Sequence, residues 1–187
     1  MKTKFLHIAT ALLFVGFTSS CSDFLDRYPL DGLSDSSFWK TENDAMMAVT
    51  DIYGCLPTWD QDEDINSDNA VHGIKWAAGN ISKGVYDPMD QSWAGSYTPI
   101  RQCNLVLEKV KDIEMSDESR KKIEGQAYFF RAFVYFNLIR SFGDVPYIDK
   151  PLNLTDVEDI TRTPREEVYA KVMADFDKAI EYLPEEW

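Results

Sequence analysis

The run AYFFRAFVYFNLI, residues 127–139, constrains the fold of this chain more than any other feature. It is apolar on nearly all sides, which indicates a helix buried on several faces. Ser116 is the expected N-cap of this helix, and Gly143 is its expected C-terminal stop. Arg131 and Arg140 need carboxylate or carbonyl partners in this apolar setting, because an unpaired buried charge is too costly.

Two shorter helices are predicted ahead of this run. In KTENDAMMAVTDIYGCLP, residues 40–57, Thr41 is the expected N-cap and Pro57 the expected stop, with apolar residues at helical spacing between them. The stretch SYTPIRQCNLVLEKVKDI, residues 96–113, shows a similar periodicity. Its apolar stripe consists of Ile100, Cys103, Leu107 and Val110.

A fourth helix is predicted to start at the sequence TPRE. Thr163 is the expected N-cap, Pro164 occupies the first turn, and Glu166 completes a capping box. The predicted apolar stripe of this helix is Val168, Val172, Phe176, Ala179, Ile180 and Leu183. No comparably long alternating segment argues for a sheet, so the predicted class is all-α.

Residues 58–95 differ from the helical stretches on both sides. They are rich in Asp, Asn and Gly, contain several aromatic residues and show no sustained period. Such a segment is longer than a loop that only connects two helices needs to be, and long loops often carry function. We therefore expect a helical domain over residues 41–187 that contains a loop-rich insert at 58–95.

The N-terminus has the pattern of a secretory signal peptide over residues 1–20. Lys2 and Lys4 form a positive start, and the short apolar run 5–17 ends in small residues. Cys21 follows directly and resembles the acylated Cys of a bacterial lipobox, although Thr18 stands where Leu is usual. We expect lipidation of Cys21, with 21–40 as an extended lipidated segment; ordinary cleavage beside a free Cys is the alternative. No second long apolar run exists, so membrane attachment would come from this lipid alone.

Charge and residue types exclude several classes of function. The formal net charge of −13 disfavours binding to nucleic acid or to anionic membrane surfaces. His72 is the one histidine after the leader and has no nucleophile motif beside it, so an enzyme is not expected. The acidic run from Asp60 opens like a calcium loop, but Ile65 and Val71 occupy its Gly and Glu positions. No metal and no cofactor are predicted.

Five segments follow one another along the chain: CSDFLD, FWKTENDAMMAVTDIYGCL, WAGSYTPIRQCNLVLEKV, EGQAYFFRAFVYFNLIRSFGDVPY and TPREEVYAKVMADFDKAIEYLP. In this order they resemble the N-terminal portion of the SusD/RagB family, the nutrient-binding outer-membrane lipoproteins of Gram-negative bacteria. The most specific piece runs from Arg140 to Pro146. The resemblance implies tetratricopeptide-like helix pairs, a lipid anchor, exposure at the cell exterior, and work with a SusC-like TonB-dependent transporter in capturing glycans.

Candidate ligand residues come from the loop-rich insert. Carbohydrate binding uses aromatic rings that stack on sugar faces, with amide and carboxylate groups that meet sugar hydroxyls. The residues that fit these roles are Trp59, Trp76 and Tyr86, with Asp68, Asn69 and Asn80 nearby. The alternative is that these aromatic side chains only pin the loop to the helices.

Family members are considerably longer than this chain, which leads us to expect a fragment or a truncated product. Two other functions therefore stay open: a tetratricopeptide-like scaffold that docks a protein partner, and a remnant that binds nothing. Cys55 and Cys103 both fall on apolar helix faces. The sequence leaves open whether they pair or remain buried thiols.

Overall fold

The computed structural model describes residues 38–56 and 93–186. This part of the chain contains the α-helices α4 (Glu42–Ile52), α5 (Trp93–Lys109), α6 (Asp117–Phe142) and α7 (Arg165–Tyr182). It also contains the 3-10 turns η1 (Tyr53–Cys55), η4 (Val110–Asp112) and η5 (Leu154–Asp156). Within the described residues, β pairing is limited to one isolated bridge between Val145 and Thr163. The all-α prediction is therefore confirmed for this part of the chain.

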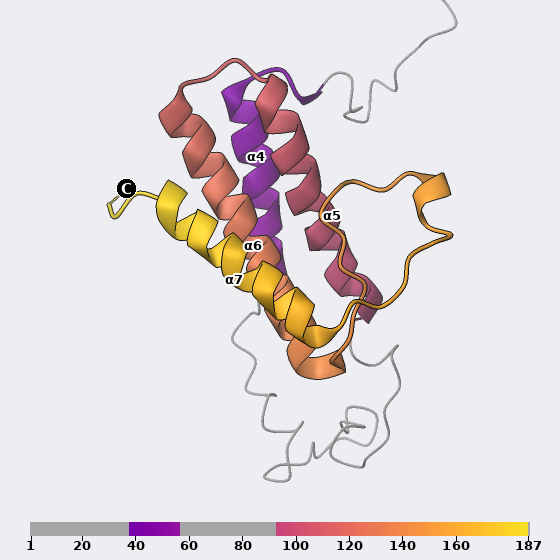
Figure 1. Cartoon of the computed structure of the whole chain (residues 1–187). Coiled ribbons are helices and arrows are strands. Elements are labelled where there is room, and N and C mark those ends of the chain that lie inside the picture. The colour runs from indigo at the N-terminus through magenta and orange to yellow at the C-terminus, as the bar shows by residue number, and fades with distance from the viewer. Residues whose placement is uncertain (1–37, 57–92, 187) are drawn as a thin grey trace, which may run out of the picture. The chain divides into compact units, whose positions relative to one another are not determined.

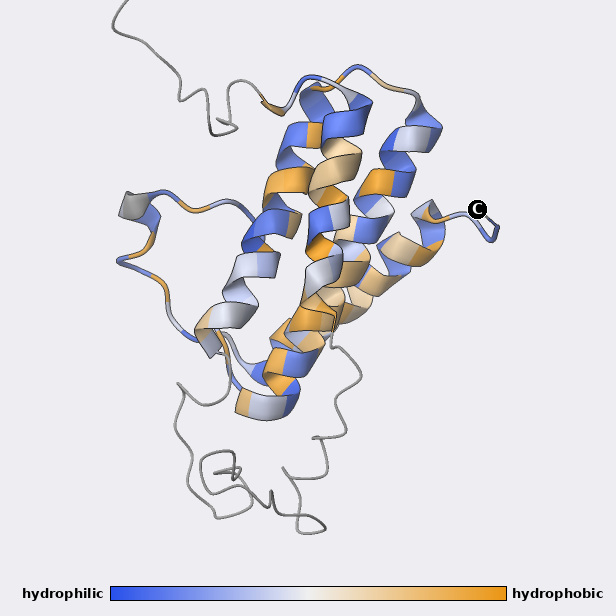
Figure 2. Ribbon diagram, turned by 180° about the vertical axis from the view of Figure 1, so that it is seen from behind, coloured by the Kyte–Doolittle hydropathy of each residue, from blue (hydrophilic) through white to orange (hydrophobic). Residues whose placement is uncertain are grey.

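α6 is the central helix and contacts each of the other three (Figure 1). It is hydrophilic in its first turns and strongly hydrophobic in its second half (Figure 2). One core cluster joins α4, α5 and the first half of α6 and includes Val49, Cys103 and Phe130. A second cluster joins the start of α5, the second half of α6 and α7 through Ile100, Tyr135 and other side chains. The aromatic run thus packs against three helices, as its all-round hydrophobicity predicts.

The predicted ends of α4 and α6 are confirmed by their hydrogen bonds. The Asp44 N–H donates to Thr41 Oγ1 at 3.3 Å, and the Thr41 N–H donates to Asp44 Oδ2 at 2.8 Å, which forms a capping box. At α6 the Ser119 N–H donates to Ser116 Oγ at 3.1 Å. Gly143 ends this helix with φ at 70°, a left-handed conformation that glycine adopts without steric cost.

α5 begins earlier than the sequence indicates. The helix starts at Trp93, so residues 93–95 are helical and the prediction of a loop up to residue 95 is wrong at that end. The Trp93 ring packs edge-on against Phe142 with ring centroids 4.9 Å apart, and this contact with α6 supports the extra turn. Pro99 lies inside the helix and has no N–H to donate toward the Gly95 carbonyl.

The predicted capping box of α7 is wrong. Pro164 is the N-cap, and no side chain of the N-cap residue bonds the first turn. The backbone of Thr163 instead pairs with Val145, with N···O distances of 2.9 and 3.3 Å, and this bridge holds it outside the helix. Asp144 takes over the capping role, because its Oδ1 accepts the Arg165 N–H at 2.9 Å.

Two faces differ from the predicted apolar stripes. Ile180 was expected in the buried stripe of α7, but it is 78% exposed, while Asp175 is only 6% exposed. On α6, Phe129 and Phe136 are 38% and 42% exposed. The buried position of Asp175 follows from its partner Arg131, which lies on the facing side of α6.

Cys55 and Cys103 are both free thiols in the structure, which answers the question that the sequence left open. Burial raises the pKa of the Cys103 thiol from 9.0 to about 12. In the part of the chain that the structure describes, no helix is both long enough and apolar enough to cross a membrane.

Candidate functional site

The residues proposed from sequence for ligand binding lie outside the described part of the chain. This holds for Trp59, Asp68, Asn69, Trp76, Asn80 and Tyr86, and equally for the lipidation candidate Cys21. Their roles stay predictions. The residues that flank the insert, however, are described, and several of them line a hollow in this part of the molecule.

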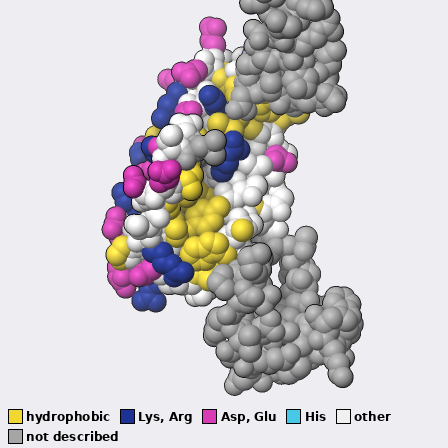
Figure 3. Space-filling model, turned by 90° about the vertical axis from the view of Figure 1, so that its right-hand side faces the viewer, with side chains coloured by type: hydrophobic (Ala, Val, Ile, Leu, Met, Phe, Trp, Pro, Cys, Tyr) yellow, Lys and Arg dark blue, Asp and Glu magenta, His cyan; other side chains and the backbone are white. Residues whose placement is uncertain are grey.

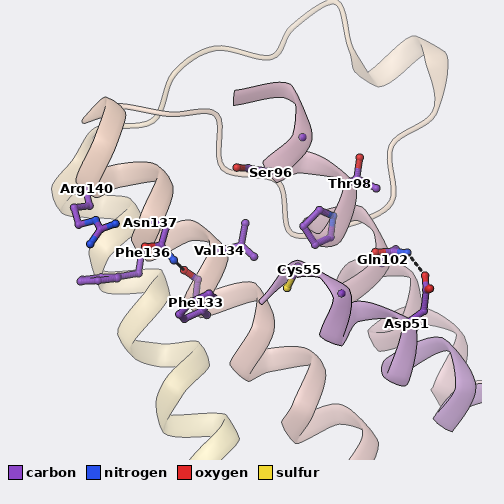
Figure 4. Close-up of a pocket in the computed structure, with 13 residues that line it drawn as sticks. Asp51, Cys55, Ser96, Thr98, Gln102, Phe133, Val134, Phe136, Asn137 and Arg140 are labelled. Atoms are coloured by element: carbon purple, nitrogen blue, oxygen red, sulfur yellow. Dashed lines mark hydrogen bonds between the residues drawn. The ribbon is translucent and has the colours of Figure 1, made fainter. Parts of the chain in front are cut away.

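This hollow, here called the α4–α5–α6 hollow, has a volume of about 860 Å³. The end of α4 with η1, the first half of α5 and the second half of α6 form its walls (Figure 4). Its lining residues are Asp51, Gly54, Cys55, Gly95, Ser96, Thr98, Pro99, Gln102, Phe133, Val134, Phe136, Asn137 and Arg140. Residues on both sides of the insert, such as Cys55 and Gly95, thus meet at one site.

Polar groups stand on two opposite sides of the hollow (Figure 4). On one side Gln102 Nε2 donates to Asp51 Oδ2 at 2.6 Å, which joins α5 to α4 and holds both side chains in place. On the α6 side, Asn137 Nδ2 donates to the Phe133 carbonyl at 3.0 Å, so its amide oxygen stays available. Arg140 lies one turn further along α6 and adds a cation.

The apolar wall of the hollow consists mainly of phenyl rings. Phe133 is half-buried and Phe136 is 42% exposed, so both present ring surface to a bound molecule. Cys55 lies between these rings and the Asp51–Gln102 pair (Figure 4). Burial raises the pKa of the Cys55 thiol, so the sulfur stays protonated near neutral pH and is a poor nucleophile.

The arrangement suits binding better than bond-making chemistry. It combines a carboxylate, two amides, a guanidinium and two phenyl rings, the kinds of group that meet the hydroxyls and apolar faces of a sugar. Among the described residues, no three His, Cys, Asp or Glu side chains gather closely enough to hold a metal ion. The groups that line the hollow can donate and accept hydrogen bonds and can stack on a ring.

A buried polar network fixes the helices below these surfaces. Arg131 donates to both carboxylate oxygens of Asp175, at 2.7 Å each, and through Nη1 to Asn104 Oδ1 at 2.8 Å. Asn104 in turn donates to the carbonyl of Ile148 at 2.9 Å. Burial opposes the charge of Arg131, but the hydrogen bonds that Arg131 donates to the Asp175 carboxylate, together with the negative charge of that carboxylate, outweigh burial and raise the pKa of the guanidinium. The network thereby ties α5, α6, α7 and the segment after α6 together.

The sequence reasoning missed these residues in different ways. The sequence predicts a carboxylate or carbonyl partner for Arg131. The position of Asp175, three residues after Val172 in the predicted apolar stripe of α7, is a signal that could have identified this partner. The lining of the hollow had no such signal. Phe133 belongs to the apolar run 127–139 that predicts a buried helix, and nothing in the local pattern separates a pocket-facing Phe from a core Phe.

Comparison with known proteins decides the family. Residues 30–187 match the family model SusD-like, described as starch-binding and associating with the outer membrane. The chain belongs to the SusD-like family. Both the α4–α5–α6 hollow and the loop-rich insert fall within the matched residues of this SusD-like chain.

Relatives and solved structures agree with this assignment. SusD-like protein P2 of Formosa agariphila is 30% identical and aligns with 98% of this chain but only 38% of its own length. A SusD-like protein of Bacteroides ovatus is 26% identical and aligns with all of this chain and 36% of its own length. A crystal structure of a SusD-like protein from Bacteroides fragilis superposes with a TM-score of 0.72 at 25% identity, over 86% of this chain and 33% of that chain. The resemblance predicted from the ordered segments is confirmed, as is the tetratricopeptide-like helical fold.

A laminarin-binding SusD-like protein also shares the fold, with a TM-score of 0.68 and 24% identity, over 78% of this chain and 35% of that chain. This SusD-like chain spans little more than a third of the length of the curated relatives it matches. The matched part is the helical portion with its insert.

Proposed function

We propose that this chain forms the helical, glycan-binding part of a cell-surface lipoprotein. It works with a SusC-like TonB-dependent transporter of the outer membrane in the uptake of a polysaccharide. The observation that carries the proposal is the match of residues 30–187 to a family described as starch-binding and associated with the outer membrane. The proposed role is binding, because the hollow combines amide, carboxylate and guanidinium groups with two phenyl rings.

The α4–α5–α6 hollow is the proposed contact surface in the described part of the chain. A sugar ring lies against Phe136 and Phe133, and its hydroxyls meet the amides of Gln102 and Asn137 and the Asp51 carboxylate. Because Gln102 and Asp51 already hold each other, little side-chain entropy is lost on binding.

The insert residues complete the proposed site. Residues immediately before and after the insert line the hollow, which supports a contribution from the segment between them. We keep as proposed ligand residues the six that the sequence indicates, Trp59, Asp68, Asn69, Trp76, Asn80 and Tyr86.

Affinity electrophoresis in gels that contain soluble starch or laminarin tests the proposal. The purified chain is expected to migrate more slowly with at least one neutral polysaccharide. Phe136→Ala and Gln102→Ala should each weaken that retardation about tenfold, equivalent to ~1.4 kcal/mol. The matched control is Phe129→Ala, which removes another partly exposed phenyl ring of α6 that lies outside the hollow. Unchanged mobility of the unmodified chain across a broad glycan panel contradicts the proposal.

Lipidation of Cys21 is proposed as the membrane anchor, since Cys21 directly follows the predicted leader. Mass spectrometry of detergent-extracted chain should find an acylated Cys21 at the N-terminus. Cys21→Ser should release the protein from the membrane fraction. Recovery of the Ser variant in the membrane at the same level would exclude this anchor.

A docking scaffold is the second candidate function, and one observation favours it. Apolar side chains of α6 and α7 lie on the surface with substantial exposure: Phe129, Phe136, Tyr169, Met173 and Ile180. Exposed apolar side chains on two packed helices suit contact with another protein. Co-purification with a transporter, combined with no retardation by any glycan, would favour the scaffold.

A further inference from the structure

A second depression lies on another side of the molecule, around the segment that follows α6. One hollow of about 380 Å³ lies between this segment and the helices α5, α6 and α7. A second hollow of about 440 Å³ lies on the segment's other side. Both are lined by Tyr147, Asp149 and Lys150, so they adjoin across these residues. We call the two together the Tyr147 groove.

The wall of the groove is held rigidly. The Tyr147 ring packs against the buried Tyr135 ring, with centroids 4.8 Å apart. The Tyr135 hydroxyl accepts the Ile148 N–H at 2.7 Å and donates to the Ile148 carbonyl at 3.1 Å. Asn104 Nδ2 holds the same carbonyl at 2.9 Å. A wall fixed by buried groups loses little freedom when a ligand binds, which is the condition for useful affinity at a shallow site.

Aromatic surface is available in the groove. Tyr147 and Tyr128 both line its first hollow and both are half-buried. The Arg131 guanidinium lies 5.4 Å from the centroid of the Tyr128 ring and keeps that ring in place beside the Arg131–Asp175 pair. Burial raises the pKa of Tyr147 to about 12, so its hydroxyl is a neutral hydrogen-bonding group at physiological pH. The two tyrosine rings, which lie beside the Arg131–Asp175 pair, offer faces for stacking and hydroxyl groups for hydrogen bonding.

The charge of the groove is close to balanced, unlike that of the chain, whose net charge is −13. Arg131 and Asp175 neutralise each other in the floor. Of the rim lysines, Lys150 lies 3.6 Å from Asp156, and Lys171 lies 6.0 Å from the centre of the Tyr147 ring. Acidic Glu108 and Asp149 stand on the same rim. A rim of mixed donors and acceptors without excess charge suits a neutral polyhydroxyl ligand better than a polyanion or a lipid.

The side of the molecule that carries the segment after α6 presents apolar as well as charged side chains (Figure 3). In this view the hydrophobic side chains form a patch beside clustered acidic and basic side chains (Figure 3). A sugar chain presents both apolar ring faces and hydroxyl edges, and so matches such a mixed surface.

We propose that the Tyr147 groove is a second glycan-contact site, which holds a neutral linear oligosaccharide across Tyr147 and on toward Tyr128. This inference rests on the proposed function, because it assigns another part of the same glycan to another surface. Two adjoining hollows divided by a tyrosine fit consecutive units of a linear polymer. The site is distinct from the α4–α5–α6 hollow, with which it shares no lining residue.

The test compares groove variants with matched controls in gels that contain laminarin or soluble starch. Tyr147→Ala, Tyr128→Ala and Lys171→Gln are expected to weaken retardation of the full chain at least fivefold each. The controls Tyr169→Ala and Lys178→Gln change an exposed tyrosine and an exposed lysine of α7 outside the groove, and should leave retardation unchanged. Thermal unfolding checks each variant. If Tyr147→Ala does not unfold cooperatively, the Tyr128 and Lys171 variants decide whether the groove contributes to glycan binding.

The outcomes separate the two proposals. Retardation that falls with Phe136→Ala but not with any groove variant overturns the groove while the proposed function stands. A chain that no glycan retards overturns both. Stronger retardation by polygalacturonate than by either neutral polysaccharide, abolished by Lys171→Gln, overturns the assignment of a neutral ligand.

Discussion

Arg131 of α6 and Asp175 of α7 face each other through two parallel hydrogen bonds of 2.7 Å, with side chains only 8% and 9% exposed. A bidentate pair of this kind fixes both the distance and the rotation between two helices. Asn104 binds the same guanidinium and, through Ile148, the segment that carries Tyr147. The pair therefore supports the groove as well as the helix packing.

Loss of one partner of this pair should be costly. Asp175→Ala leaves the Arg131 guanidinium buried without its carboxylate, and we expect a loss of about 3–5 kcal/mol in the free energy of unfolding. The double variant Arg131→Met with Asp175→Leu should lose clearly less, because no uncompensated charge remains. Urea unfolding followed by circular dichroism measures both. Removal of the exposed Lys178–Glu181 pair serves as the control and should leave stability nearly unchanged.

Gly125 should tolerate no side chain. A Cβ built there lies 2.9 Å from Leu183 Cγ and 3.1 Å from Tyr182 Cβ, so α7 would have to move away from α6. We expect Gly125→Ala to destabilise the chain by about 1–3 kcal/mol, even though alanine is the better helix former. Gly54→Ala is the matched control, because nothing lies within 4 Å of its Cβ position. Equal unfolding midpoints for the two variants would contradict this close packing.

Substitutions at the start of α7 can distinguish Thr163, the cap predicted from sequence, from Asp144, the cap found in the structure. Asp144→Ala removes the acceptor of the Arg165 N–H and should cost about 1 kcal/mol, the usual value of a helix cap. Thr163→Ala should have little effect, because the backbone and not the side chain of Thr163 makes the bridge to Val145. Thermal melting of the two variants measures the difference. The opposite order of effects would restore Thr163 as the cap.

Stability should fall at alkaline pH. Burial raises the pKa of Cys103 from 9.0 to about 12 and that of Tyr97 from 10.0 to about 12. Between these values the unfolded chain releases protons that the folded chain retains, so the stabilisation present below pH 9 is lost progressively up to about pH 12. Urea unfolding at a series of pH values should show this decline.

Cys103→Ala separates the two contributions to this decline. The variant is less stable at pH 7 because it leaves a cavity, yet its decline above pH 9 should be shallower. A slope identical to that of the unmodified chain would show that the thiol does not ionise on unfolding.

The sequence alone was sufficient for features that depend on neighbours in the chain. The Thr41 cap, the Ser116 cap and the Gly143 stop arise within one turn of a helix, so local pattern predicts them. The ordered segments were likewise enough to indicate the family, which the match over residues 30–187 confirms.

The candidate site depended much less on local pattern. Its predicted ligand residues lie outside the described part of the chain and stay predictions. The hollow that the structure does describe joins Asp51, Gln102 and Phe136, which three different helices contribute. The spacing of apolar residues along one helix does not indicate which face of that helix will line a hollow that two other helices also form.

Sequence therefore determined that the described part of this protein is all-α, where most of its helices begin and end, and that Arg131 needs a carboxylate or carbonyl partner. Only the tertiary structure decided that the partner is Asp175, that Asp144 caps α7 in place of Thr163, and that Ile180 faces outward. The physical reason is the range of the interactions. Caps and helical periods are set within a few residues, whereas buried pairs and exposed faces are set by how whole helices pack.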